Sequence, residues 1–350
     1  MSIPSPDTAC GLCPSTGRAR GAPTLAGVLA RLRAAGADPP FGDPRAHHGV
    51  ALEGYFWRFT DPAAGRVVVV LLGISLDAAG AGWGTVALAA HPGGFVRSTT
   101  LSRAAGHPRC LQVAAEHEDG TVALRADART LTVDLGDGAA LRARLEGPVP
   151  WPRRAFGGTG PAQVVPGLSQ YWHPWLLGGR VRGSACLDGE QVGLDGARAY
   201  AEKNWGAGGF PDVWWWGHAQ AFPRDDACVA FAGGHAGVGP LRALATSVVV
   251  RVDDDVVRLT RPPGLLDVQA DQSGWRIRGR TARHALELEG TAAGTPAHRL
   301  PVPVPGQRRE IPGGSAQHLA GELRVCLRRG RRTVLKGTSP LAGLELGRGR

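Results

Sequence analysis

Short apolar or alternating segments, separated by turns rich in glycine and aspartate, follow one another along most of this chain. Residues 66–74 (RVVVVLLGI) have the composition of a buried strand, and residues 135–138 (LGDG) have that of a hairpin turn. Many short strands of this kind predict an all-β fold built of antiparallel barrels or sandwiches. The further strand segments are residues 83–90, 121–126, 130–135, 139–145, 179–187, 197–202, 213–221, 227–233, 241–252, 256–260, 275–280, 284–289, 321–327, 333–336 and 341–346.

Glycine and proline limit what the rest of the chain can form. With 52 glycines and 27 prolines, long helices are disfavoured. A single short amphipathic helix is expected over residues 24–35, with Thr24 as its N-cap and Gly36 as its stop. The small, proline-rich residues 1–23 are expected to form a disordered tail.

A stretch rich in proline and glycine, residues 147–169, interrupts the strand pattern near the middle of the chain. A chain of 350 residues exceeds what one hydrophobic core usually serves. We therefore expect two domains, an N-terminal β domain over residues 24–160 and a C-terminal β domain over residues 161–350.

The net charge of +10 comes almost wholly from scattered arginines. No basic stripe alternates with exposed aromatic residues, so nucleic acid is not an expected partner. Peripheral contact with an anionic membrane is a candidate interaction for such a surface. The sequence shows neither a secretory signal nor an apolar run of the roughly 20 residues that span a bilayer. We expect a cytoplasmic protein that makes at most peripheral contact with a membrane.

The spacing of cysteine and histidine does not predict a metal site. Cys10 and Cys13 form a lone C-x-x-C pair without a second pair at zinc spacing. His47 and His48 are adjacent, and no histidine pair has the spacing of metal ligands together with a third ligand. We expect neither a metal nor a cofactor. Buried free thiols are expected at the remaining cysteines, Cys110, Cys186, Cys228 and Cys326.

The dipeptide Lys203-Asn204 stands out from the composition. Lys336 is the only other lysine among 40 lysine and arginine residues, and Asn204 is the sole asparagine. Lysine carries a compact ammonium whose pKa shifts readily, and asparagine both donates and accepts hydrogen bonds. Their pairing therefore indicates a site that arginine and aspartate do not fill.

More than half of the aromatic residues lie between residues 171 and 231. On a strand, Trp214, Trp216, His218 and Gln220 share one face, and Trp215 points to the other. Such a face predicts a flat pocket for a ring-bearing or prenyl ligand. The alternative is a core that is simply rich in tryptophan.

A second aromatic cluster lies near the N-terminus. Alternation places Glu53, Tyr55, Trp57 and Phe59 on one face of a strand. Because glutamate is rarely buried unpaired, Glu53 marks either a pocket or a strand end where it pairs with an arginine.

Glu202 and Lys203 are adjacent, so on a strand their side chains face opposite ways. If Glu202 enters an apolar cavity, desolvation raises its pKa and makes it a proton donor near neutral pH. If Lys203 enters instead, its pKa falls and it serves as a base or a hydrogen-bond donor. The alternative is a buried ion pair that locks the two domains together.

Residues 200–206 (YAEKNWG), followed by Phe210-Pro211 and a tryptophan-rich strand ending near Gln220, resemble the signature segment of the tocopherol cyclase family. Supporting similarity lies in residues 52–58 (LEGYFWR), 230–234 (AFAGG), 286–289 (LELE), 294–296 (GTP), 321–324 (GELR) and 341–347 (LAGLELG). The resemblance implies two lipocalin-like antiparallel β-barrel or sandwich domains, the second of which carries the E-K-N-W-G motif. It also implies acid-catalysed cyclisation of a prenylated hydroquinone to a chromanol without a cofactor, the reaction of an intramolecular lyase or isomerase.

Two other functions fit the same resemblance: a non-catalytic carrier of lipids or other hydrophobic ligands, and a related alkene hydratase. For the cyclase, Glu202 is the expected acid and Glu53 its rival, and Lys203 or His218 is expected at the phenol. Asn204 is expected to orient the quinol or Glu202. The residues expected to bind the prenyl quinol are Tyr55, Trp57, Trp172, His173, Tyr200, Trp205, Trp214, Trp216, His218 and Gln220.

Overall fold

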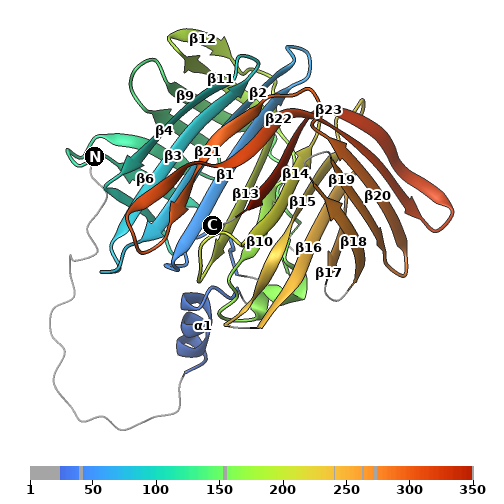
Figure 1. Cartoon of the computed structure of the whole chain (residues 1–350), viewed down its shortest axis with the longest axis horizontal. Helices are drawn as coiled ribbons and strands as arrows, with labels where there is room; N and C mark the ends of the chain where they lie inside the picture. Colours follow the sequence, from blue (N-terminus) through green and yellow to red (C-terminus); the bar gives the residue numbers. More distant parts are fainter. Residues whose placement is uncertain are drawn as a thin grey trace.

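The computed structural model describes residues 24–38, 42–152, 156–239, 241–261, 264–271 and 274–348. These residues form two antiparallel sheets, one α-helix, α1 (Leu25–Ala34), and one 3-10 turn, η1 (Gly160–Val164) (Figure 1). The expected all-β class with a short N-terminal helix is therefore confirmed. The expected tail over residues 1–23, with Cys10 and Cys13, lies outside the described residues.

Helix α1 begins and ends where the sequence predicts. The Thr24 hydroxyl accepts a hydrogen bond from the Gly27 amide at 3.2 Å, which satisfies a free N–H group of the first turn. Gly36 has a φ of 86° and reverses the chain after the last turn. Within the described ranges, no helix combines the length and the apolar character that crossing a bilayer requires.

The first sheet has 13 strands. Their bounds are β1 (Leu52–Asp61), β2 (Arg66–Leu76), β3 (Gly82–His91), β4 (Phe95–Leu101), β5 (Arg103–Gly106), β6 (Gln112–Glu116), β7 (Val122–Asp127), β8 (Thr130–Asp134), β9 (Ala140–Glu146), β10 (Tyr171–Leu176), β11 (Arg180–Leu187), β12 (Glu190–Gly193) and β13 (Arg198–Gly206). The main path runs β4-β3-β2-β1-β13-β11-β9-β8-β7-β6-β5, with β10 paired to β13 and β12 paired to β11.

The second sheet has 10 strands. Their bounds are β14 (Val213–Ala219), β15 (Cys228–Val238), β16 (Leu241–Val252), β17 (Asp255–Arg261), β18 (Leu265–Ala270), β19 (Trp275–Arg280), β20 (His284–Thr291), β21 (Ala297–Val304), β22 (Arg309–Arg329) and β23 (Arg332–Arg348). The path runs β17-β16-β15-β14-β23-β22-β20-β19-β18, and β21 pairs with β22.

Each sheet curls around a hydrophobic core of its own (Figure 1). Strand β5 contacts β3 across the first sheet, and β17 contacts β18 across the second. Tyr55 and Trp57 of β1 belong to the first core, and Trp215 of β14 belongs to the second. Since Trp215 points into its own core, alternation turns Trp214 and Trp216 the other way, toward the first sheet.

The chain passes from one sheet to the other at residues 207–212, between β13 and β14. Strand β13, with the E-K-N-W-G motif, lies between β1 and β11 in the first sheet. Residues 147–169 contain η1 and no change of sheet. The expected domain boundary at residue 160 is a statement about which segments of the chain fold on their own. It stays a prediction.

The four cysteines of the described ranges, Cys110, Cys186, Cys228 and Cys326, are free thiols. Cys228 is buried as expected, but Cys110 is exposed and Cys186 and Cys326 are partly exposed. The expectation of burial was therefore wrong for Cys110, which lies in an exposed turn before β6 rather than in a strand.

Candidate active site

An apolar pocket of about 240 Å³ lies between the two sheets. Strands β1, β2 and β3 form one wall, and strands of the second sheet, including β14, β21 and β23, form the other. Phe56, Leu71 and Val302 are typical of its aliphatic and aromatic lining, and Glu202 and Asn204 are among the polar residues that also line it. Pockets lined mainly by apolar side chains bind apolar ligands and orient them by the polar groups among them.

The register of β1 with β13 decides which side chains face this pocket. Phe56 lies opposite Glu202 and Gly54 opposite Asn204, so these residues share the face that meets the second sheet. Tyr55 lies opposite Lys203, and this pair faces the other way. Glu202 and Asn204 line the pocket, whereas Lys203 is fully buried behind the sheet.

Glu202 is held by three neutral donors that converge on one of its oxygens. Its Oε2 accepts hydrogen bonds from Trp172 Nε1 at 2.9 Å, Tyr200 Oη at 2.5 Å and Trp216 Nε1 at 3.0 Å. Among the described residues, no hydrogen bond is made to Oε1. Oε1 is therefore the oxygen that can carry and deliver a proton.

Burial raises the pKa of Glu202 to about 7, because the charged carboxylate is poorly solvated between the sheets. The hydrogen bonds from Tyr200, Trp216 and Trp172 act in the opposite direction, and the nearby carboxyl of Glu345 adds to the rise. The Glu202 carboxyl is therefore about half protonated at neutral pH, and it can both release a proton and take one back. This balance is what a general acid requires.

Indole rings surround the acid. Trp172 and Trp216 line the pocket and point their N–H groups at Glu202, and Trp214 lines it further along β14. Phe56 packs edge-on against Trp216, with ring centroids 5.2 Å apart. The faces of such rings stabilise a nearby cation by roughly 0.5–2 kcal/mol each.

Asn204 contributes a second polar group to the pocket. Its side chain makes no hydrogen bond with the described residues, so its amide is free to bind a ligand. The residue opposite it on β1 is Gly54, and a Cβ placed there would overlap the Asn204 Oδ1. Glycine at position 54 therefore makes room for the asparagine.

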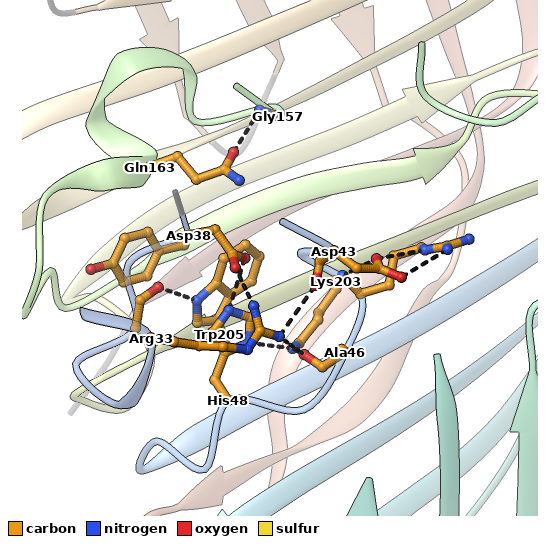
Figure 2. Close-up of polar contacts among 12 residues, drawn as sticks. Arg33, Asp38, Asp43, Ala46, His48, Gly157, Gln163, Lys203 and Trp205 are labelled. Atoms are coloured by element: carbon orange, nitrogen blue, oxygen red, sulfur yellow. Dashed lines mark hydrogen bonds and ion pairs between the residues drawn. The ribbon is translucent and has the colours of Figure 1, made fainter. Parts of the chain in front are cut away.

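The opposite face of the same strands carries a buried charged network (Figure 2). Lys203 Nζ lies 2.6 Å from Glu53 Oε2 and 2.8 Å from His48 Nδ1, and it donates to the Ala46 carbonyl at 2.7 Å. His48 in turn contacts Asp38 at 2.9 Å, and the carboxylate of Asp38 pairs with Arg33 of α1.

This network fixes the charges of its central pair. Burial alone would raise the pKa of the Glu53 carboxyl, but the charge of Lys203 and hydrogen bonds from His47 and His48 hold that pKa well below its usual range. Burial lowers the pKa of Lys203, and Glu53 opposes that shift. The pair ties β13 to β1 and to the loop after α1, and it presents no proton donor to the pocket.

The residues that the sequence predicts for the site divide between the two faces. Those whose side chains face the pocket are Trp172, Glu202, Asn204, Trp214 and Trp216. The Tyr200 hydroxyl donates to the Glu202 carboxyl, which lines the pocket. The His218 ring stacks on the Tyr200 ring, with centroids 3.8 Å apart. The Gln220 side chain donates to the Arg198 carbonyl. The predicted residues on the far face are Glu53, Tyr55, Trp57, His173, Lys203 and Trp205.

Within the described ranges, no three histidine, cysteine, aspartate or glutamate side chains gather as metal ligands would. Trp205 is committed to structure: its Nε1 donates to the Gly36 carbonyl at 2.7 Å, and its ring stacks between His48 and Tyr171. His173 is buried, and burial lowers its pKa to about 3, so it stays neutral.

Residues 162–348 match the family model described as tocopherol cyclase-like. The chain belongs to the tocopherol cyclase-like family. Among curated relatives, the probable chloroplastic tocopherol cyclase of Oryza sativa subsp. japonica is 26% identical over 197 residues, and the chloroplastic tocopherol cyclase of Zea mays is 27% identical over 199 residues. Each alignment covers 53% of this chain, which spans 41% of the length of each relative.

The crystal structure of CghA with Sch210972 has a similar fold, with a TM-score of 0.58 and 15% identity over 86% of this chain and 89% of that one. The tocopherol cyclase-like segment of this chain includes β13, β14 and β23. It therefore contains Glu202, Asn204 and the paired indoles, whereas Glu53 on β1 precedes it.

Sequence reasoning missed a second polar cluster of this tocopherol cyclase-like chain, formed by Glu345, Ser315 and Gln317. All three line the pocket, and Glu345 is buried beside Trp214. A signal was available, because Glu345 lies between Leu344 and Leu346 in a strand of the C-terminal segment. Alternation alone does not tell whether this glutamate faces solvent or a pocket, and only the pairing of β23 with β14 places it inside.

Proposed function

We propose that this protein cyclises a prenylated hydroquinone to a chromanol, with Glu202 as the general acid. The observation that carries the proposal is the Glu202 carboxyl: its pKa is raised to about 7, three donors hold one oxygen, and the other oxygen is left for a proton. The apolar pocket with its indole faces and the tocopherol cyclase-like family match support the same reaction.

The chemistry follows from those groups. The Glu202 proton is transferred to an alkene carbon of the prenyl chain, which leaves a tertiary carbocation next to indole faces. The carboxylate that forms is stabilised by the three hydrogen bonds to Oε2. The adjacent phenol oxygen then bonds to the cation, and its proton returns to Glu202.

Substrate and product are isomers, so the reaction consumes no oxidant, reductant or cofactor. Water must be kept from the cation, and the apolar walls between the sheets serve this purpose. Asn204 is placed to orient the hydroquinone, since its amide faces the pocket and can both donate and accept.

The test is incubation of the purified protein with a prenyl hydroquinone, followed by chromatography and mass spectrometry. A product of unchanged mass and new retention time is the cyclised chromanol. Gain of the mass of one water indicates an alkene hydratase, and binding without a product indicates a carrier; either result overturns the cyclase proposal.

The acid is tested by Glu202→Gln, which keeps the shape of the side chain but has no proton to deliver. We expect ligand affinity within about threefold of the wild type and turnover reduced at least 100-fold. The matched control is Glu287→Gln, which makes the same change at an exposed strand position. Full turnover in folded Glu202→Gln would remove Glu202 from the mechanism.

A further inference from the structure

A second carboxyl, Glu345 on β23, lies in the wall of the same pocket. Its Oε1 accepts hydrogen bonds from Trp214 Nε1 at 2.6 Å and Ser315 Oγ at 2.7 Å, and its Oε2 accepts from Gln317 Nε2 at 3.1 Å. These partners are all neutral, and no ion pair joins Glu345 to a cation within the described ranges. Because buried structural carboxylates are usually paired with a cation, this one calls for another explanation.

The cluster around Glu345 has unused capacity for hydrogen bonds. Gln317 Oε1 is buried and has no partner among the described residues. Glu345 Oε2 has only the bond from Gln317. Buried acceptors without partners cost free energy, and both Gln317 and Glu345 line the pocket. A ligand hydroxyl placed here can donate its one hydrogen bond to Gln317 Oε1 or to Glu345 Oε2.

The two carboxyls of the pocket are linked through one indole ring. Trp216 lies directly opposite Glu345 in the pairing of β14 with β23, and its Nε1 donates to Glu202 Oε2. The Cα atoms of opposite residues in an antiparallel pair lie about 4.5–5.5 Å apart. The pocket thus has an acid end at Glu202 and a second polar end at Glu345, with Trp216 between them.

A prenyl hydroquinone has two hydroxyls on opposite sides of a flat ring. In the proposed cyclisation, the hydroxyl next to the prenyl chain attacks the cation and must lie at the acid end. The second hydroxyl then projects away across the ring. A flat ring lying along Trp216 would bring it toward Glu345 and Gln317.

We propose that Glu345 and Gln317 form a specificity subsite for the second hydroxyl of the hydroquinone, the one that takes no part in ring closure. This inference rests on the proposed function. The subsite positions the ring and selects hydroquinones over monophenols with the same prenyl chain, and neither residue takes part in proton transfer to the alkene.

The test compares two ligands by isothermal titration calorimetry: a prenyl hydroquinone, and the monophenol that keeps the attacking hydroxyl and the same chain. We expect the wild type to bind the hydroquinone about tenfold more tightly, which is the size of effect of one hydrogen bond. Glu345→Gln and Gln317→Met should each reduce that ratio to below about threefold, with the affinity for the monophenol unchanged.

The Glu287→Gln control should keep the tenfold ratio, since its side chain lies on an exposed strand position. Unchanged monophenol affinity shows that each variant is folded, and Gln317→Met carries the test if Glu345→Gln fails to fold. A wild-type ratio near one, or a full ratio in both variants, would overturn the subsite. Binding needs no turnover, so absence of chromanol would refute the proposed reaction without altering this comparison.

Discussion

Two buried carboxyls on neighbouring strands, Glu53 on β1 and Glu202 on β13, have opposite surroundings. Glu53 faces the ammonium of Lys203 and accepts from the His48 and Gly49 amides, so its pKa lies well below the usual range. Glu202 faces neutral donors, and burial raises its pKa to about 7. Of these two carboxyls, only Glu202 can hold a proton near neutral pH, which is why we propose it as the acid in place of Glu53.

The pKa of Glu202 gives a pH dependence with a definite sign. The acid must be protonated, so turnover should fall about tenfold per pH unit above about 7 and level off below it. Tyr200→Phe removes a hydrogen bond that lowers this pKa. The alkaline limb of the pH–rate profile should therefore move to higher pH, and the plateau rate should fall because the acid is weaker.

The control for this shift is Tyr171→Phe, which also deletes a buried tyrosine hydroxyl. That hydroxyl donates to the Val165 carbonyl and does not touch Glu202. The alkaline limb of the pH–rate profile of Tyr171→Phe should stay at the wild-type pH. An alkaline limb that does not move in Tyr200→Phe would show that another group controls the profile.

Lys203 illustrates a structural use of a rare residue. It and Glu53 are both fully buried and 2.6 Å apart. Lys203→Met would leave the Glu53 carboxylate buried without its cation, and we expect a loss of about 3–5 kcal/mol in the free energy of unfolding. Adding Glu53→Gln should recover a large part of that loss, because the uncompensated charge is then gone.

Urea denaturation of the two single variants and the double variant measures this coupling. Additive losses would mean that the ion pair contributes nothing beyond its two parts.

The sequence marks Lys203 and Asn204 through their scarcity and places Glu202 and Lys203 on opposite faces through alternation. It leaves open which face meets the pocket, because that depends on the packing of β1 and β13 against the second sheet.

At the scale of elements, the strands that the sequence predicts are those with clear periodicity. β16 (Leu241–Val252) and β19 (Trp275–Arg280) have the predicted bounds. The prediction over 321–327 covers only part of β22 (Arg309–Arg329), whose first half contains Pro312 and Gly313. Proline and glycine are typical of turns, so the sequence does not predict a strand there. Proline is nevertheless compatible with an irregular stretch of strand.

Strands β14 and β23 pack closely because glycine on one faces tryptophan on the other. A Cβ added at Gly347 would overlap the Trp214 ring, which lies opposite it. Gly347→Ala should therefore displace the indole, break its hydrogen bond to Glu345 and weaken binding of a prenyl hydroquinone at least tenfold. Calorimetric titration measures the affinity.

The matched control is Gly337→Ala on the same strand. The nearest heavy atom to a Cβ at that position is Phe222 Cδ1 at 3.6 Å, an ordinary contact. Binding and stability should stay close to wild type in this variant. Equal binding in both variants would place Trp214 outside the ligand site.

At the scale of the whole molecule, the pocket joins segments from both ends of the chain. Gly54 and Phe56 on β1 meet Glu345 on β23 across it. Local periodicity assigns each segment to a strand, but it carries no information on which strands of the two sheets oppose each other. This is the physical reason why Glu202 and the indoles were predicted and Glu345, with Ser315 and Gln317, was not.

The sheet topology also predicts which fragments of the chain fold on their own. The sequence predicts an N-terminal domain over residues 24–160, whereas the sheet that begins with β1 is completed by β13 at Gly206. Strand β13 lies between β1 and β11, so a fragment ending at residue 160 lacks a central strand and the Lys203 partner of Glu53.

We expect a fragment of residues 24–206 to unfold cooperatively in urea, followed by circular dichroism, because it keeps every strand of the first sheet and its core. A fragment of residues 24–160 should show no cooperative transition, since β1 then has a bare edge and Glu53 an uncompensated buried charge. Cooperative unfolding of the shorter fragment would instead establish the boundary at residue 160. In that case β10 to β13 would have to add to a core that is already stable, and the pocket would form only when the second half of the chain docks.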